Sequence, residues 1–440
     1  MLWQIKKVLH GHFPDLREHL MELFDPRVGV QYSVEELILA GIMLFLMKND
    51  SRNAFNHKQK DSLFRKNYYR LFRLRLPHMD AVDKLLEKID PAQIENIRCR
   101  LIHALIEKRV LHKFRFYGTY FYVAIDGTGV YNWNENTSEN ILDQALTKES
   151  RNGKESYSFQ VLEAVLVCSN GMTIPLISEW IANYTKPYDK QDCELKAFKR
   201  LAVRLKNNFP RLNICILADG LYSNVSMMDI CRQYDWKFIT VFRDGNLPSV
   251  WNEVECLLPL AGATKSKKQS LYACGCWITR SYRWIREMDY KNHPIHWIEC
   301  VQETVHDKTG EIKNNRFVFL SNLEVSCENI VPILMAGRAR WLIEDHFNSQ
   351  KNRGGSLHHK FNRTHFNALR NWHNVRQLAC MILELVKHTD KLRQILKENT
   401  KMTLKELWEN LTGYLSMCSV MDDMFKFELW SKSKRQIRLE

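Results

Sequence analysis

The stretch FYVAIDGTG at residues 121–129 is an apolar run, rich in aromatic and β-branched residues, that leads into an Asp-Gly pair. A second stretch, LNICILADG at residues 212–220, has the same form. Each run predicts a buried strand, and Asp126 and Asp219 are expected at the two strand ends. Ligands of open α/β sheets bind at the carboxyl ends of the strands. The two stretches therefore predict the core of a sheet and a candidate site at its edge.

The segments around these strands predict a mixed α/β sheet. Residues 159–167 and 172–180 are strand-like and are joined by Ser169-Asn170-Gly171, which indicates a hairpin. An amphipathic helix is expected over residues 189–207, a second helix capped by Ser223 is expected to run to Tyr234, and a further strand is expected at 238–242. A hairpin followed by alternating helix and strand is typical of a sheet with helices packed on it.

The flanking regions divide the chain into five parts. Residues 1–115 carry helical periodicity, including a Ser33/Glu36 capping box and a helix that starts at Pro91. Strand patterns at 271–278 and 295–301, with a loop of three lysines before them, predict an all-β insertion. The predicted parts are a helical domain at 1–115, a sheet domain at 116–243 and 321–388, the β insertion at 244–320 and a helical segment with a basic tail at 389–440. The three loop lysines are Lys265, Lys267 and Lys268, and the tail residues are Lys432, Lys434, Arg435 and Arg438.

Composition excludes several classes of protein. Of 440 residues, 45% are hydrophobic and 26% charged, which is typical of a globular protein and not of a disordered chain. The longest apolar run, 37–47, is shorter than the roughly 20 residues that a membrane span needs. Twelve cysteines without a CxxC pair predict free thiols in a reducing cytoplasm. A net charge of +14 favours a polyanionic partner, nucleic acid above all, although ribosomal contacts or acidic lipids also fit.

The positive charge is concentrated in two clusters. Between Arg52 and Arg75 there are eight basic residues and one acid. Four aromatic residues, Phe64, Tyr68, Tyr69 and Phe72, alternate with them. Such a segment fits either a solvated helix face or a DNA-facing surface, and the aromatic residues favour DNA because bases and sugars pack on rings. The predicted DNA contacts in this cluster are Arg65, Lys66, Arg70 and Arg73.

The second cluster runs from Arg338 to Arg376 and has eight basic residues against two acids, Glu344 and Asp345. At about 100° per residue, Glu344 and Lys351 share one helix face with Arg340, whereas Asp345 points elsewhere. This face fits an intrahelical salt-bridge ladder. It also fits a third carboxylate beside phosphate-binding cations. The excess of basic residues favours the second interpretation.

Three acids are thus candidates for one metal site. Asp126 and Asp219 on neighbouring strands would repel each other unless a cation lay between them. Carboxylate oxygens select hard cations such as Mg²⁺ or Mn²⁺. Each Asp-Gly pair, taken alone, equally fits a plain turn.

The combination of these motifs resembles the DDE transposases of bacterial insertion sequences. The closest group has a helix motif Tyr-x2-Arg-x3-Glu-x6-Lys, which Arg340, Glu344 and Lys351 match. Gly337 stands where the motif has tyrosine. The resemblance covers about residues 116–388, and the long interval before Glu344 matches the β insertion of that group.

The resemblance implies an RNase H-like catalytic domain and DNA transposition by cutting and joining. Two Mg²⁺ ions, for which Mn²⁺ can substitute, would be held by Asp126, Asp219 and Glu344. Arg340, Lys351 and Arg353 would contact DNA. The group often cuts the second strand through a hairpin in which a flipped base stacks on an aromatic residue of the insertion. The candidates for that residue are Trp251, Trp277, Trp284 and Trp297.

The implied partners are double-stranded DNA, as transposon ends and target, and a second copy of the chain in a homodimer at the bacterial nucleoid. Two alternatives stay open. One is a host-adopted endonuclease of the same fold, and the other is a DNA-binding regulator whose chemistry is lost. Three converging carboxylates would argue against the regulator, since DNA binding alone does not need them.

Overall fold

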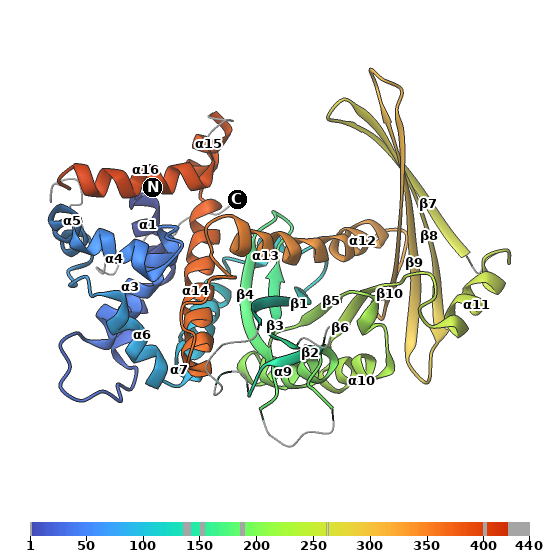
Figure 1. The fold of residues 1–440 in the computed structure, drawn as a ribbon. Helices are drawn as coiled ribbons and strands as arrows, with labels where there is room; N and C mark the ends of the chain where they lie inside the picture. Colours follow the sequence, from blue (N-terminus) through green and yellow to red (C-terminus); the bar gives the residue numbers. More distant parts are fainter. Residues whose placement is uncertain are drawn as a thin grey trace.

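The computed structural model shows a mixed α/β protein with a helical part, a central sheet and a projecting arm (Figure 1). None of the described helices combines the length and apolar character needed to cross a membrane. The basic tail lies outside the described part of the chain. The structure describes residues 2–134, 141, 143–149, 155–184, 190–260, 262, 264–398 and 403–420.

The helical part confirms the prediction for the first 115 residues. Its third helix is buried along its whole length and begins with the predicted Ser33/Glu36 capping box. Asp90 caps the seventh helix, which has Pro91 in its first turn. The elements are α1 (Leu2–His12), α2 (Leu16–Met21), α3 (Val34–Leu46), α4 (Arg52–Lys60), α5 (Ser62–Phe72), α6 (Met79–Lys88), α7 (Pro91–Glu107) and the 3-10 turn η1 (His112–Phe114).

A helix from the far end of the sequence completes this part. The long helix α14 (Phe366–Lys387) packs against α3, α6 and α7 on one side and against strand β4 (Thr173–Ile181) on the other (Figure 1). The contact with α3 is close because Gly41 leaves room for Val375 and Trp372. The helices α15 (Asp390–Glu398) and α16 (Leu404–Met417) follow, and α16 packs on α5. The helical part is therefore built from both ends of the chain.

The ten-stranded sheet has the order β2-β3-β1-β5-β6-β10-β9-β8-β7, and β4 pairs with β3. Strand β1 is antiparallel to β3 and parallel to β5, and β5 is parallel to β6. The predicted mixed sheet and the β3–β4 hairpin are confirmed. The remaining strands are β1 (Phe121–Asn134), β2 (Leu146–Glu149), β3 (Glu155–Val167), β5 (Ile214–Ala218), β6 (Lys237–Val241), β7 (Thr264–Ala273), β8 (Cys276–Asp289), β9 (Pro294–His306) and β10 (Ile312–Ser321).

Helices cover both faces of the central strands, as the alternation of side chains along β1 requires. Val123 and Ile125 pack in a core with α9 (Glu194–Asn208) and α10 (Val225–Tyr234). Tyr122 and Ala124 pack in a second core with α12 (Ile330–Arg338) and α13 (Leu342–Asn352). The even-numbered residues of β1, Asp126 among them, therefore belong to the face that carries α13.

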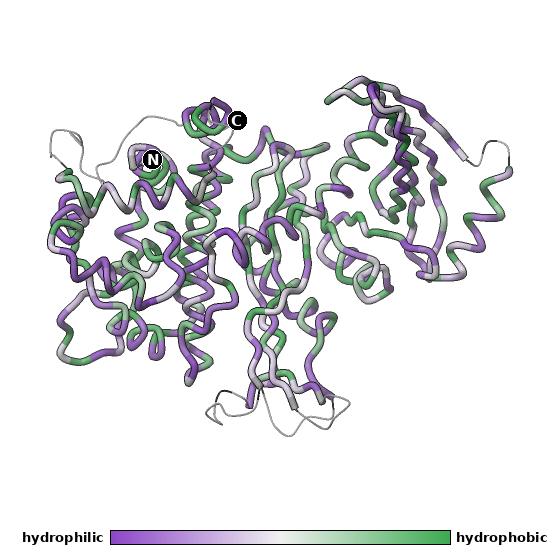
Figure 2. Tube along the Cα trace, turned by 45° about the horizontal axis from the view of Figure 1, so that its top comes forward, coloured by the Kyte–Doolittle hydropathy of each residue, from purple (hydrophilic) through white to green (hydrophobic). Residues whose placement is uncertain are grey.

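Strands β7 to β10 continue the central sheet and project from it as the arm (Figure 1). Green, apolar residues are frequent in the sheet and helices, whereas the arm is mostly purple and pale (Figure 2). The prediction of an all-β region at 244–320 is wrong in part, because Pro248–Leu257 forms helix α11. The stretch 271–278 is two strands around a turn at Gly275, and the three lysines lie in β7 instead of a loop.

Candidate active site at the acidic cluster

Asp126 lies inside a strand and not at its end, which corrects the prediction. Strand β1 continues to Asn134, with a register shift between Gly129 and Tyr131. Asp219, by contrast, follows the end of β5 as predicted. The two strands are parallel and pair Ala124 with Leu217. Asp126 and Asp219 each come two residues later, so the register places them side by side.

The turn after β5 fixes Asp219. Its Oδ1 accepts a hydrogen bond of 2.9 Å from the backbone N–H of Leu221 and so caps the 3-10 turn η2 (Gly220–Tyr222). The next helix, α10, is capped by Asn224 instead of Ser223. The Ser223 hydroxyl donates to Thr240 Oγ1 on β6 and ties the turn to the sheet.

Arg340 joins Asp126 to Glu344 across the face of the sheet. It lies in a 3-10 turn, η3 (Ala339–Trp341), just before α13, and not within one continuous helix as predicted. Its Nη2 donates to Glu344 Oε1 at 2.6 Å and its Nη1 donates to Asp126 Oδ2 at 3.5 Å. The residue is 5% exposed, and its buried Nε has no hydrogen-bond partner among the described residues. One buried guanidinium thus holds two of the three predicted carboxylates.

The acid next to Glu344 lies apart from this cluster. Asp345 is exposed and pairs with Arg353 Nη2 at 3.3 Å. Lys351 is half-buried on α13, with its ammonium 6.0 Å from the centre of the Phe347 ring. Of the predicted DNA contacts on this helix, Arg353 is exposed, Lys351 is half-buried and Arg340 is engaged inside the cluster.

Glu194, which the sequence analysis missed, is a fourth acid of this site. It is the first residue of α9, and its carboxyl carbon and Oε1 lie 3.0 Å from the point where a Cβ on Gly127 would stand. Tyr222 donates to Glu194 Oε1 at 2.9 Å. Because α9 was expected to begin at residue 189, nothing in the sequence indicated that Glu194 would face β1.

Burial and neighbouring acids raise the pKa of Asp126 and of Glu194. Burial raises the pKa of Asp126 to about 6, the Glu194 and Asp219 carboxylates add to that rise, and Arg340 opposes it. Burial also raises the pKa of Glu194, with a further contribution from Asp219, against the hydrogen bond from Tyr222. Among the described residues, no Lys, Arg or His forms an ion pair with Asp219 or Glu194. Perturbed carboxylates of this kind are frequent at functional sites.

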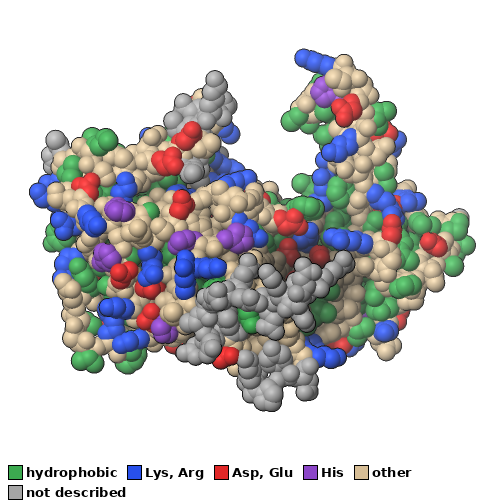
Figure 3. All heavy atoms as spheres, in the orientation of Figure 1, with side chains coloured by type: hydrophobic (Ala, Val, Ile, Leu, Met, Phe, Trp, Pro, Cys, Tyr) green, Lys and Arg blue, Asp and Glu red, His purple; other side chains and the backbone are tan. Residues whose placement is uncertain are grey.

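The donor set fits a hard divalent cation, since it offers only carboxylate oxygens whose repulsion a cation would relieve. In the described ranges, no three His, Cys, Asp or Glu side chains already surround one point as metal ligands. The Arg340 guanidinium lies between the Asp126 and Glu344 carboxylates instead. Basic and acidic side chains gather in the hollow between the arm and the rest of the molecule (Figure 3).

A cavity of about 690 Å³ opens beside Arg340, lined by Phe242, Arg316, Arg338 and Trp341, among others. The Trp341 side chain is 63% exposed, and it was not among the predicted aromatic residues. Gly337 also lines the cavity but faces the sheet. A Cβ there would stand 3.0 Å from Ile239 and Phe319, which explains why a tyrosine does not fit at this position.

The four predicted tryptophans have different environments. Trp284 and Trp297 are buried in the core, so they are not available to a flipped base. Trp277 is exposed near the end of the arm beside Tyr272. Trp251 lies on α11 and stacks on Phe242, a residue that lines the cavity, with ring centres 4.6 Å apart.

Most aromatic residues of the first basic cluster are buried, which corrects the prediction that they form an exposed surface for DNA. Phe64, Tyr68 and Phe72 are core residues, and only Tyr69 is exposed. The basic residues differ among themselves. Arg65, Lys66 and Arg73 are exposed, whereas Arg70 donates to the carbonyl of Val420 after α16.

No known family model matches the chain, and no curated protein sequence matches it. The functional interpretation therefore depends on the geometry of the acidic cluster and on the motifs of the sequence.

Proposed function

We propose that the protein is a metal-dependent DNA transposase of the DDE type, with Asp126, Asp219 and Glu344 as its catalytic acids. The observation that carries the proposal is the buried Arg340, which binds Asp126 and Glu344, two acids that are distant in the sequence, while Asp219 lies beside Asp126. The three acids come from two parallel strands and one helix. Such convergence is expected where a cation must be held, and a surface ladder on one helix does not account for it.

The topology supports an RNase H-like domain. The strands β4, β3 and β1 form an antiparallel group, and β5 and β6 continue parallel to β1. The interval between β6 and α12 contains α11 and the strands of the arm, as an insertion ahead of the Glu344 helix would. In this interpretation, the arm borders the hollow that takes up DNA.

Asp126, Asp219 and Glu344 would hold two Mg²⁺ ions, or Mn²⁺ in their place. Bound there, the ions would supply activation of a water and then of a DNA 3′-hydroxyl, and charge stabilisation at the leaving oxygen. The side chains of the protein would hold the DNA in position. Arg340 and Lys351 would contact phosphates beside the cut, and Arg353, just after α13, would contact the DNA backbone further along.

The cavity beside Arg340 supports a hairpin step. Its volume is in the range of pockets that enclose small ligands, and the exposed Trp341 in its lining offers aromatic surface. Arg316 and Arg338 would neutralise a phosphate nearby. A base turned out of the duplex would stack here during cleavage of the second strand.

DNA binding and assembly follow from the same proposal. Duplex DNA would serve as transposon end and target, and two copies of the chain would hold two ends in a homodimer at the nucleoid of a bacterial cell. The exposed Arg65, Lys66 and Arg73 would bind phosphates of the end sequence.

The DNA assignment is tested by the salt dependence of binding. Each phosphate contact contributes a slope of about −0.9 to log K against log salt on duplex DNA. Replacing Arg65 and Lys66 together by alanine should make the slope less negative by between about 1 and 2, because both side chains are exposed. A slope equal to that of the wild type would remove α5 from the DNA-binding surface.

The alternatives are separated by one assay on DNA that carries the sequences flanking the gene. A transposase nicks these ends with Mg²⁺ and joins the 3′-hydroxyl to a target. An endonuclease nicks but does not join. A silent regulator binds and does neither, and that outcome would contradict the proposed function.

A further inference from the structure

Glu194 stands where a ligand of the acidic cluster should stand, although no part of the DDE motif contains it. The carboxyl group lies against the backbone at Gly127, directly after Asp126. Gly127 belongs to the face of β1 that carries α9, and only the absence of a side chain there lets the Glu194 carboxyl approach. The Tyr222 hydroxyl holds the same carboxyl from the turn that follows Asp219. Glu194 therefore touches both strand segments that bear the predicted acids.

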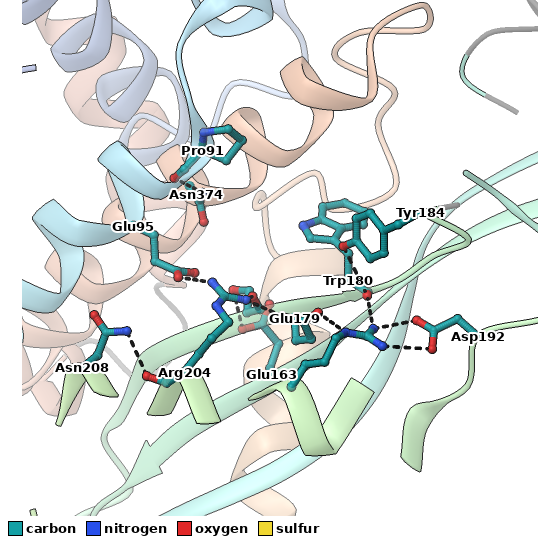
Figure 4. Close-up of polar contacts among 12 residues, drawn as sticks. Pro91, Glu95, Glu163, Glu179, Trp180, Tyr184, Asp192, Arg204, Asn208 and Asn374 are labelled. Carbon is teal, nitrogen blue, oxygen red and sulfur yellow. Dashed lines mark hydrogen bonds and ion pairs between the residues drawn. The ribbon is translucent and has the colours of Figure 1, made fainter. Parts of the chain in front are cut away.

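A network of ion pairs fixes the start of α9. Arg200 donates to Asp192 Oδ2 at 2.6 Å and to Glu179 Oε1 at 2.7 Å, and Arg204 pairs with Glu179 and with Glu95 on α7 (Figure 4). Asp192 Oδ2 also accepts from the backbone N–H of Ala182, just after β4. Because Asp192 is held by these contacts, the chain enters α9 at a defined position. Glu194 is thus presented to Gly127 by a rigid support.

The charges around Glu194 are not balanced by the protein. The cluster contains four carboxylates, Asp126, Asp219, Glu194 and Glu344, and one guanidinium, that of Arg340. Arg340 is 95% buried, and its Nη atoms bind Asp126 and Glu344. In the part of the chain that the structure describes, its Nε has no hydrogen-bond partner. The side facing Glu194 and Asp219 has no cation among the described residues. A divalent cation bound there would balance the negative charge of Glu194 and Asp219.

We infer that Glu194 is a fourth carboxylate ligand of the metal site and shares one ion with Asp126 and Asp219. This inference rests on the proposed function and adds a residue from the opposite face of the sheet to its three acids. Asp126, Asp219 and Glu194 then hold one ion at the edge of the sheet, where β5 has ended at Ala218 and the Glu194 carboxyl reaches Gly127. A DNA phosphate beside the cut would attract the Arg340 guanidinium away from Glu344. The Glu344 carboxylate would then complete the metal site from the α13 side.

The test is Mn²⁺ binding by the full-length chain, measured by electron paramagnetic resonance with and without duplex DNA. Glu194→Gln should weaken Mn²⁺ binding by at least about tenfold, the loss typical even of outer-shell partners of a metal. Asp126→Asn should do the same. Asp345→Asn, which removes an exposed acid next to the site, is the matched control and should bind as the wild type does.

Glu194→Gln also separates a ligand from a structural role. The glutamine keeps an oxygen that accepts from Tyr222, so a role limited to that hydrogen bond would leave Mn²⁺ binding unchanged. If a variant folds poorly, the shift in Tm caused by Mn²⁺ gives a second measure of metal binding. Mn²⁺ should raise the Tm of the wild type and of Glu194→Asp, which keeps the charge, more than it raises the Tm of Glu194→Gln.

The outcomes distinguish the inference from the proposed function. If Asp126→Asn loses Mn²⁺ and Glu194→Gln binds it like the wild type, the metal site stands and Glu194 is not part of it. If Asp126→Asn also binds Mn²⁺ like the wild type, or the wild type binds none, the metal site itself is refuted and the inference fails with it.

Discussion

Two groups of acidic residues meet α9, and their charge balance differs. Beside β4, the acids Glu95, Glu179 and Asp192 are matched by Arg98, Arg200 and Arg204 (Figure 4). Beside β1, Arg340 pairs with Asp126 and Glu344, and no cation of the described residues pairs with Asp219 or Glu194. A buried acid that is paired costs little further energy, whereas an unpaired one destabilises the fold. The difference supports the proposal that the second group binds a ligand, whereas the first group stabilises the fold.

The largest effect is expected from variants that change the acids beside β1. Asp126→Asn or Asp219→Asn should reduce DNA cleavage by several orders of magnitude, because an amide cannot replace a charged metal ligand. The same change removes a repelled carboxylate, so the free energy of unfolding without metal should stay the same or rise. Nicking assays and urea unfolding on the same preparations check both statements. A variant that nicks at the wild-type rate would exclude Asp126 or Asp219 from the chemistry.

Variants in the group beside β4 should lose stability and keep metal binding. Arg204→Met removes the cation shared by Glu95 and Glu179 and leaves two buried acids with less compensation. We expect a loss of about 2 kcal/mol in unfolding free energy, below the usual range for a broken buried pair because the Arg204 side chain is 35% exposed. Metal binding should persist in the folded fraction.

The control for this variant is Arg100→Met, which breaks an exposed pair with Glu22 and should leave the free energy of unfolding almost unchanged. Equal losses in the two variants would show that the network beside β4 does not stabilise the fold.

A smaller effect appears in the pH dependence of stability. Folded Asp126 keeps its proton up to about pH 6, whereas the unfolded chain releases it near pH 3.8. The folded protein therefore binds more protons in this window, and stability falls as the pH rises through it. The contribution is on the order of 3 kcal/mol, given about 1.4 kcal/mol per pKa unit.

Asp126→Asn should flatten this fall between pH 4 and 6 in metal-free buffer, as followed by urea unfolding at several pH values. The control is Asp345→Asn, whose acid is exposed and outside the cluster. The explanation fails if the wild type and Asp126→Asn lose stability in parallel over that window.

Much of the fold follows from local signals in the sequence. The turn at Ser169-Asn170-Gly171 and the cap at Ser33 depend on residues close together in the chain, so pattern and propensity suffice. Asp126 was placed at a strand end because Gly127 and Gly129 look like a turn. In the structure, Gly127 is a strand residue that makes room for Glu194. A glycine is needed at position 127 because of a contact between segments that are distant in the sequence, and no local pattern indicates such a contact.

Part of the site was predictable from the geometry of strands and helices. Asp126 and Asp219 could be paired because parallel strands bring equivalent ends together, and Glu344 could be separated from Asp345 by helix geometry. Glu194 and Trp341 carry no local signal, since their roles depend on where α9 and η3 dock. Phe64, Tyr68 and Phe72 were assigned to a DNA surface because a short amphipathic helix does not reveal which face is covered, and here α16 packs on α5.

The central claim is that the cluster around Asp126 is a catalytic metal site, and two neighbouring residues of like charge test it most directly. Glu344→Gln and Asp345→Asn should be compared for cleavage of end DNA, first with Mg²⁺ and then with Mn²⁺, after both variants are shown to fold. Glu344→Gln should lose cleavage by several orders of magnitude, because Glu344 shares Arg340 with Asp126. Asp345→Asn should lose at most a few-fold, because its partner is the exposed Arg353. An active Glu344→Gln beside an inactive Asp345→Asn would contradict the account.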